Sequence, residues 1–143
     1  MVMKNKKITE PYIITFPKIG DDNIGFISVC ENYKEIPFTI NRVFWTYNTP
    51  ANVTRGNHAH FESEQVLLAL NGIIKLTLET INGKTYSFIL DTPNKGIYIP
   101  IKTWIKMEYL NEATQLVLAS TKYDESEYIR DYNKFKQMQA VNG

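Results

Sequence analysis

Apolar and polar positions alternate through the middle of the chain, in short runs separated by turn residues. The run 73–80 alternates in part, with Ile74, Leu76 and Leu78 on one face of an extended chain, and Tyr86, Phe88 and Leu90 alternate again in the next run. Asn82-Gly83 lies between them, and these residue types supply the positive φ angles that a tight hairpin needs. This pattern predicts a β-hairpin.

Further short apolar runs predict more strands, with turns between them. The predicted strands cover residues 12–16, 25–31, 65–70, 97–101, 104–110 and 115–120. Asn71-Gly72 predicts a second hairpin, and a join is expected near Asn111. Short strands at regular spacing are typical of a sandwich or barrel, so an all-β domain is expected.

The period changes to that of a helix near the end of the chain. Asp124 is suited to cap this helix, and Glu127 stands three residues later, as in a capping box. The apolar residues that then recur at helical spacing are Tyr128, Ile129, Tyr132 and Phe135. The pattern predicts a C-terminal α-helix packed on the outside of the β core.

Composition narrows the class without changing the fold. The 143 residues are expected to form one domain, 1–143, because they suffice for a single core. Lys and Arg total 16 against 15 Asp and Glu, which gives no electrostatic footprint for nucleic acid or an anionic membrane. Cys30 is the only cysteine, so an intrachain disulfide is excluded and a reducing compartment is expected. No apolar run is long enough to span a membrane. The lysines at the start precede no apolar run, so a signal peptide is not expected. A cytoplasmic location is expected.

The only two histidines, His58 and His60, stand two residues apart. In a strand, residues i and i+2 point to the same face, so the two imidazoles are expected to project together. Paired imidazoles with a carboxylate, such as Glu64, can bind a divalent metal. They can equally transfer protons near neutral pH.

His58, His60 and Glu64 reproduce the first metal motif of the cupin superfamily. The second cupin motif supplies a further histidine after a proline, but here Ile105 stands at that place after Pro100. Since isoleucine cannot ligate a metal, a metal-free cupin is expected.

The resemblance extends to a particular cupin family, the dTDP-sugar 3,4-ketoisomerases. The segments that carry it are Arg-Gly-Asn-His-Ala-His at 55–60, Glu-Gln-Val-Leu at 64–67, Gly-Ile-Tyr-Ile-Pro at 96–100 and Tyr-Asp-Glu-Ser-Glu-Tyr-Ile-Arg-Asp-Tyr at 123–132. The resemblance implies a cupin jelly roll with a C-terminal helix, dimers with exchanged strands, and no metal or redox cofactor. It implies that the ketone of dTDP-4-keto-6-deoxyglucose moves from C4 to C3, for 3-amino-3,6-dideoxy sugars of surface polysaccharides.

The candidate site residues follow from that chemistry. Removing a hydrogen α to a ketone needs a base, an acid and a group that holds the oxyanion, and His58 and His60 are suited to the first two roles. The sequence does not show which histidine does which. The expected substrate-binding residues are Arg55, for the diphosphate, with Gln65, Tyr98 and Trp104. Glu64 is expected to orient one of the histidines.

Five residues at four places in the chain depart from the pattern of the family: Ile24, Phe44-Trp45, Asn57 and Ile105. Ile24, Phe44-Trp45 and Ile105 stand where the family commonly carries polar side chains, and Asn57 stands where it commonly carries a bulky apolar one. Three other hypotheses therefore stay open. These are an isomerase or epimerase for a related nucleotide keto sugar, a nucleotide-sugar-binding protein without turnover, and a metal-dependent cupin. The configuration of the product at C4 is not fixed by the sequence.

Overall fold

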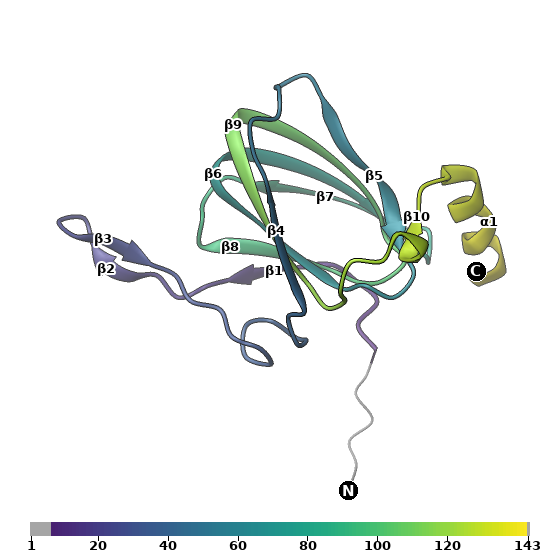
Figure 1. The fold of residues 1–143 in the computed structure, drawn as a ribbon, viewed down its shortest axis with the longest axis horizontal. Coiled ribbons are helices and arrows are strands. Elements are labelled where there is room, and N and C mark those ends of the chain that lie inside the picture. Colours follow the sequence, from purple (N-terminus) through teal and green to yellow (C-terminus); the bar gives the residue numbers. More distant parts are fainter. Residues whose placement is uncertain (1–6, 143) are drawn as a thin grey trace, which may run out of the picture.

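The protein is described by a computed structural model that covers residues 7–142, so Lys4 and Lys6 lie outside the described residues. It is a mainly antiparallel β-structure with one α-helix at its C-terminal end (Figure 1). The elements are β1 (Tyr12–Thr15), β2 (Ile19–Asp21), β3 (Gly25–Ile27), β4 (Arg42–Thr46), β5 (Thr54–His60), β6 (Gln65–Glu79), β7 (Thr85–Leu90), β8 (Lys95–Ile99), β9 (Trp104–Ala119), the 3-10 turn η1 (Glu125–Glu127), β10 (Tyr128–Ile129) and α1 (Tyr132–Asn142).

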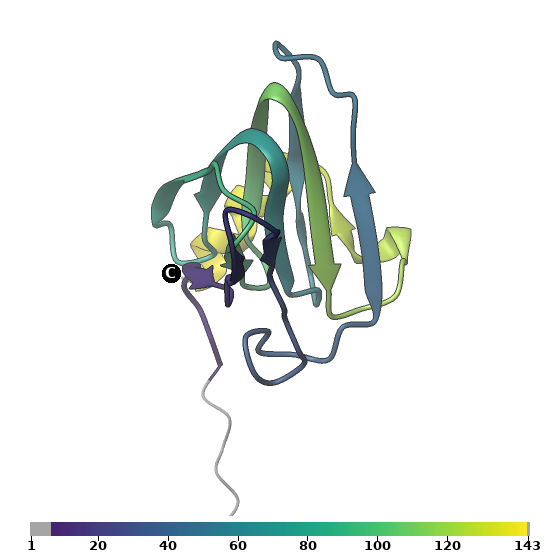
Figure 2. The ribbon, with the colours of Figure 1, turned by 90° about the vertical axis from the view of Figure 1, so that its left-hand side faces the viewer.

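Two long strands, β6 and β9, organise the molecule. They pair with each other along nearly their whole length, from Gln65 opposite Ala119 to Glu79 opposite Trp104. The first half of β6 also pairs with β8, whereas its second half pairs with β7. The first half of β9 pairs with β5 and its second half with β4. The bent pair therefore belongs to two layers, which face each other in Figure 2.

The main core lies between these layers, where each strand turns alternate side chains inward. Leu67, Ile97 and Val117 come from one layer, and Leu76 and Ile105 come from the other; all are at most 2% exposed. This arrangement confirms the predicted all-β cupin jelly roll with a C-terminal helix.

Asn71-Gly72 is not a hairpin turn, contrary to the prediction. It lies inside β6 at a β-bulge, and Gly72 has a φ of +71°. A Cβ at Gly72 would lie 2.6 Å from the Cα of Ala113 on β9, so only glycine fits this close approach. Asn111 and Glu112 also have positive φ, and the predicted join near Asn111 is a bend within one strand. Bulges bend paired strands, and here they fold one sheet into two layers.

Asn82-Gly83 does form the predicted hairpin, between β6 and β7. The backbone N–H of Gly83 donates to the Thr80 carbonyl over 2.9 Å, and Gly83 has a φ of +84°. Neither residue pairs with a neighbouring strand in the part of the chain that the structure describes, so the turn preference of Asn82 and Gly83 decides the local structure by itself.

The N-terminal part extends away from the two layers. β1 pairs with β8 as an edge strand, as the apolar run 12–16 predicts. The predicted strand 25–31 ends at Ile27, and the predicted turn before it contains β2; the two strands form a separate hairpin. This hairpin projects from the body in Figure 1. The strand β4 was not predicted, although Arg42, Phe44 and Thr46 turn inward in strict alternation.

The predicted helix begins later than the capping signal indicated. Asp124 caps only the three-residue turn η1, where its carboxylate accepts the backbone N–H of Ser126 over 3.0 Å. β10 follows and pairs with β5, and α1 begins at Tyr132. Glu127 is therefore not a capping-box partner; its side chain has other contacts. Phe135 is fully buried, so α1 does pack on the outside of the β core. Within residues 7–142, no helix is long and apolar enough to cross a membrane.

Candidate functional site

A bulge in β5 positions the two histidines. Gly56 and Asn57 both have positive φ, and the pairing of β5 with β9 shifts register between Gly56 and His58. Asn57 adopts a left-handed conformation that asparagine tolerates better than a bulky apolar residue. His58 and His60 then project together, with ring centroids 5.0 Å apart, as the i, i+2 spacing predicts. This arrangement places the His58 ring at a cavity and the His60 ring directly behind it.

The hydrogen-bond partners of the two rings define their tautomers. His58 Nδ1 lies 3.0 Å from the carbonyl oxygen of Gly56; because a carbonyl only accepts, Nδ1 carries the proton. His60 Nδ1 lies 2.6 Å from the Glu127 carboxylate and donates to it for the same reason. His60 Nε2 then accepts from the side-chain amide of Gln65 over 3.2 Å. His58 Nε2 has no hydrogen-bond partner among the described residues, so it is free to accept a proton.

Burial keeps both imidazoles neutral at pH 7. Loss of hydration lowers the pKa of His58 to about 4, with the neighbouring His60 and Arg130 acting in the same direction. Burial also lowers the pKa of His60, while the Glu127 carboxylate opposes that shift. A neutral imidazole with an unshared lone pair is the form that a general base requires.

A cavity of about 240 Å³ opens in front of His58. Its lining comes from both layers and from the C-terminal segment: Phe44, Thr46, Arg55, Gly56, His58, Gln65, Leu67, Ile105, Met107, Gln115, Val117, Tyr128 and Arg130. Three of the expected site residues, His58, Arg55 and Gln65, are therefore together at one cavity. His60 is 3% exposed and reaches the cavity only through its neighbours His58 and Gln65.

The positions that depart from the family pattern lie in three different environments. Phe44 and Ile105 line the cavity, and Ile105 pairs directly with His58 across β5 and β9. Trp45 is 61% exposed on the outer side of β4. Ile24 is 81% exposed in the turn of the β2–β3 hairpin. The cavity wall is thus apolar at Phe44 and Ile105, and these side chains keep water from the surroundings of His58.

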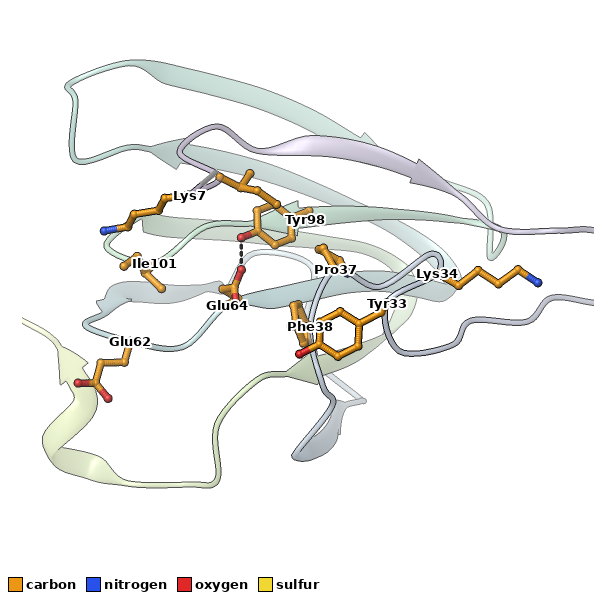
Figure 3. Close-up of a pocket in the computed structure, with 10 residues that line it drawn as sticks. Lys7, Tyr33, Lys34, Pro37, Phe38, Glu62, Glu64, Tyr98 and Ile101 are labelled. Atoms are coloured by element: carbon orange, nitrogen blue, oxygen red, sulfur yellow. Dashed lines mark hydrogen bonds between the residues drawn. The ribbon is translucent and has the colours of Figure 1, made fainter. Parts of the chain in front are cut away.

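Tyr98 and Glu64 are not at this cavity. The Tyr98 hydroxyl donates to the Glu64 carboxylate over 2.5 Å, and both line a separate pocket of about 730 Å³ together with Tyr33 and Phe38 (Figure 3). The prediction that Glu64 orients a histidine is wrong for this structure, because Glu127 accepts from His60 instead. Tyr98 is consequently placed away from His58.

Trp104 also lies elsewhere. Its ring packs against Tyr132 and Phe135 of α1, with centroid distances of 5.2 and 5.7 Å, and it is 5% exposed. It belongs to the apolar cluster beneath the helix, so the structure places it in packing rather than beside the cavity.

The carboxylate of the cupin metal motif does not converge with the histidines. Among residues 7–142 there is no group of three His, Cys, Asp or Glu side chains placed to hold a metal ion. The donors His58, His60 and Glu64 therefore do not fit a metal site in this structure.

Three residues of the C-terminal segment complete the site, and the sequence did not single them out for it. Glu127 accepts a hydrogen bond from His60. The ring centroid of Tyr128 lies 5.3 Å from that of His58 and 4.4 Å from that of His60. The guanidinium carbon of Arg130 lies 4.4 Å from the centroid of the Tyr128 ring. From the sequence, Glu127 was interpreted as a capping-box partner, Tyr128 as part of an apolar stripe on a helix, and Arg130 only as part of the segment 123–132. What brings these residues to the site is the pairing of Tyr128 with His60 across β10 and β5, and this pairing is not visible in the sequence.

Arginines give the site its positive charge. Arg55 and Arg130 both line the cavity, and Arg130 is also held by Glu125 at 2.7 Å. The Arg42 guanidinium lies 5.3 Å from the ring of Phe44 and 5.8 Å from that of Tyr123, and its buried Nε and Nη2 have no hydrogen-bond partner within residues 7–142. Guanidinium groups match the oxygens of phosphate, so an anionic substrate is favoured.

The bent, double-layered sheet with imidazoles facing its interior is the architecture of a cupin-like jelly roll. A family model described as "FdtA: WxcM-like, C-terminal" matches residues 9–140. The TDP-4-oxo-6-deoxy-alpha-D-glucose-3,4-oxoisomerase of Aneurinibacillus thermoaerophilus is 39% identical over 129 residues, which cover 90% of this chain and 91% of that relative. The chain belongs to the FdtA family.

Solved structures agree with this assignment. A 3,4-ketoisomerase from Helicobacter canadensis is 39% identical with a TM-score of 0.86, covering 93% of this chain and 99% of that one. A His-to-Asn mutant of the 3,4-ketoisomerase QdtA from Thermoanaerobacterium thermosaccharolyticum, in complex with TDP-4-keto-6-deoxyglucose, is 33% identical with a TM-score of 0.85; the match covers 92% and 94% of the two chains.

Proposed function

We propose that this protein is a 3,4-ketoisomerase that moves the ketone of TDP-4-keto-6-deoxyglucose from C4 to C3. The observation that carries the proposal is the state of His58, whose proton is held at Nδ1 by the Gly56 carbonyl and whose Nε2 is free at the cavity. The family membership and the substrate bound to QdtA support the choice of sugar nucleotide.

In the proposed reaction, His58 Nε2 takes the proton from C3. The electrons of the C3–H bond form a C3–C4 double bond, and the C4 carbonyl oxygen takes up a proton, which gives an enediol. The protonated His58 then gives its proton to C4 as the C3 hydroxyl loses its own proton, which forms the C3 ketone and restores neutral His58. His60, paired with Glu127, does not line the cavity; its proposed contribution passes through Gln65, whose amide its Nε2 holds toward the sugar oxygens. Atoms and electrons balance without a redox partner.

The volume of the cavity limits which part of the substrate it can hold. Its 240 Å³ falls below the roughly 300–1,000 Å³ of pockets that enclose a drug-sized ligand. The sugar therefore occupies the cavity, and the diphosphate lies at the mouth beside Arg55 and Arg130. The nucleotide remains outside the two layers of this chain.

The β2–β3 hairpin supports a homodimer with exchanged N-terminal strands. Its large apolar side chains are exposed, among them Ile19 at 56%, Ile24 at 81% and Ile27 at 66%. An isolated two-stranded hairpin is marginally stable in water, so a second copy of the chain is the proposed cover for this surface. We also propose that the protein acts in the cytoplasm. Its product would supply a 3-aminotransferase that makes amino sugars for surface polysaccharides.

The test is incubation of the purified protein with TDP-4-keto-6-deoxyglucose, followed by NMR of the product trapped by a 3-aminotransferase. A 3-amino-3,6-dideoxy sugar nucleotide is the expected product, and its couplings give the configuration at C4. Binding of the substrate without any product would contradict isomerisation and favour a binding protein. Inversion at a carbon with the ketone still at C4 would favour an epimerase.

A further inference from the structure

A single carboxylate joins the C-terminal segment to the histidine pair. Glu127 Oε2 accepts from His60 Nδ1 at 2.6 Å, and Oε1 accepts the backbone N–H groups of Glu62 and Ser63 at 2.8 and 2.6 Å. Its backbone carbonyl also accepts the N–H of Phe61 at 2.9 Å. The side chain is 10% exposed, so these contacts are largely shielded from water.

Glu127 determines which atom donates and which accepts in the hydrogen bonds that link it through His60 to Gln65. A carboxylate only accepts, so His60 must donate through Nδ1 and accept through Nε2. Gln65 must then donate its amide N–H to His60 Nε2. The oxygen of the Gln65 amide accepts no hydrogen bond from the described residues, and Gln65 lines the cavity. That oxygen is the acceptor left for a hydroxyl of the sugar.

We propose that Glu127 is a positioning residue, which acts through His60 to fix both the tautomer of that imidazole and the orientation of the Gln65 amide. This inference rests on the proposed function for its effect on turnover, but its structural content does not. Removing such partners from metal-ligating histidines costs about 10- to 100-fold in affinity or activity, and we expect an effect of the same order here.

The decisive variant is Glu127→Gln. Its amide can donate to His60 Nδ1, which moves the imidazole proton to Nε2. The amide N–H of Gln65 then faces an N–H of His60 instead of a lone pair. We expect kcat to fall about 10- to 100-fold with a much smaller change in KM. Glu62→Gln is the matched control, because it removes a neighbouring carboxylate that does not touch His60, and wild-type kinetics are expected.

A second readout separates positioning from a merely structural role. The chain has only two histidines, so ¹⁵N NMR of His58→Asn reports His60 alone. The expected proton is on Nδ1 in that background, on Nε2 when Glu127→Gln is added, and again on Nδ1 with Glu127→Asp. These spectra need no substrate, so they stand even if the isomerase assay fails.

Two results would overturn the inference. One is an Nε2 proton on His60 while Glu127 is present. The other is a folded Glu127→Gln protein with wild-type kcat, or with reduced kcat and an unchanged tautomer. If Glu127→Gln does not fold, the Glu127→Asp spectrum decides, because a proton on Nε2 in that variant contradicts control by the carboxylate.

Discussion

The rings of His58 and His60 are 5.0 Å apart and almost perpendicular, with an interplanar angle of 87°, yet each Nδ1 has a different kind of acceptor. For His58 it is a neutral carbonyl, and for His60 it is a carboxylate. Two residues of one type, two positions apart, therefore have different chemical characters. This difference leaves His58 Nε2 free for the substrate and makes His60 part of a hydrogen-bonded chain.

The first prediction concerns the titration of His58. Because burial lowers its pKa to about 4, its NMR midpoint should lie far below that of an exposed histidine, near 6.5. The unfolded chain then binds more protons than the folded one between these pH values, so stability should fall as the pH drops from about 6.5 to 4 and change no further on this account below that. A midpoint near 6.5 in the folded protein would contradict the burial; the same measurement in urea provides the reference.

The second prediction concerns the bulge in β5. Gly56 has a φ of +91°, and a Cβ there would lie 2.7 Å from the Ile105 carbonyl oxygen. Gly83 has a similar φ of +84°, but apart from its two chain neighbours no described residue has an atom within 4 Å of its Cβ position. Gly83→Ala should cost roughly 1–2 kcal/mol from backbone strain alone. Gly56→Ala should cost more and should also reduce kcat, because the Gly56 carbonyl anchors His58. Equal losses of melting temperature would contradict this account.

The third prediction separates packing from substrate binding at Trp104. Its buried indole Nε1 has no hydrogen-bond partner in the described part of the chain, so Trp104→Phe loses contact area but no hydrogen bond seen there. The expected cost is about 1–3 kcal/mol in thermal unfolding, with kcat/KM unchanged. A large fall in kcat/KM at an unchanged melting temperature would instead show that the indole contacts the substrate.

The fourth prediction tests the exchanged dimer. Ile24→Glu places a charge on the most exposed part of the β2–β3 hairpin and should shift the protein toward the 16.6 kDa monomer in light scattering. Asn23→Glu adds the same charge at the preceding residue without replacing an apolar side chain, so it should remain dimeric. A wild-type protein that is monomeric at all concentrations would contradict the dimer.

The sequence was sufficient where local chemistry decides the outcome. Asn82-Gly83 forms the predicted hairpin because the turn needs only its own two residues. His58 and His60 lie side by side because strand geometry sets the direction of residues i and i+2. The fold class followed from many such local signals.

The sequence was insufficient where distant segments decide. Asn71-Gly72 has the same residue types as a hairpin, but β9 lies beside it and bends with it, so the strand continues. Glu127 resembled a capping residue because the position of β5 beside β10 is not visible in the local pattern. The preference of Glu64 for Tyr98 over a histidine likewise depends on β8, more than thirty residues away.

The most direct test of the central claim is solvent exchange at C3 of TDP-4-keto-6-deoxyglucose in D₂O, followed by ¹H NMR. The wild-type protein should replace the C3 proton with deuterium and form the 3-keto product, whereas folded His58→Asn should slow both by about 100- to 10,000-fold. Exchange and turnover at the wild-type rate in His58→Asn would contradict the assignment of His58 as the base.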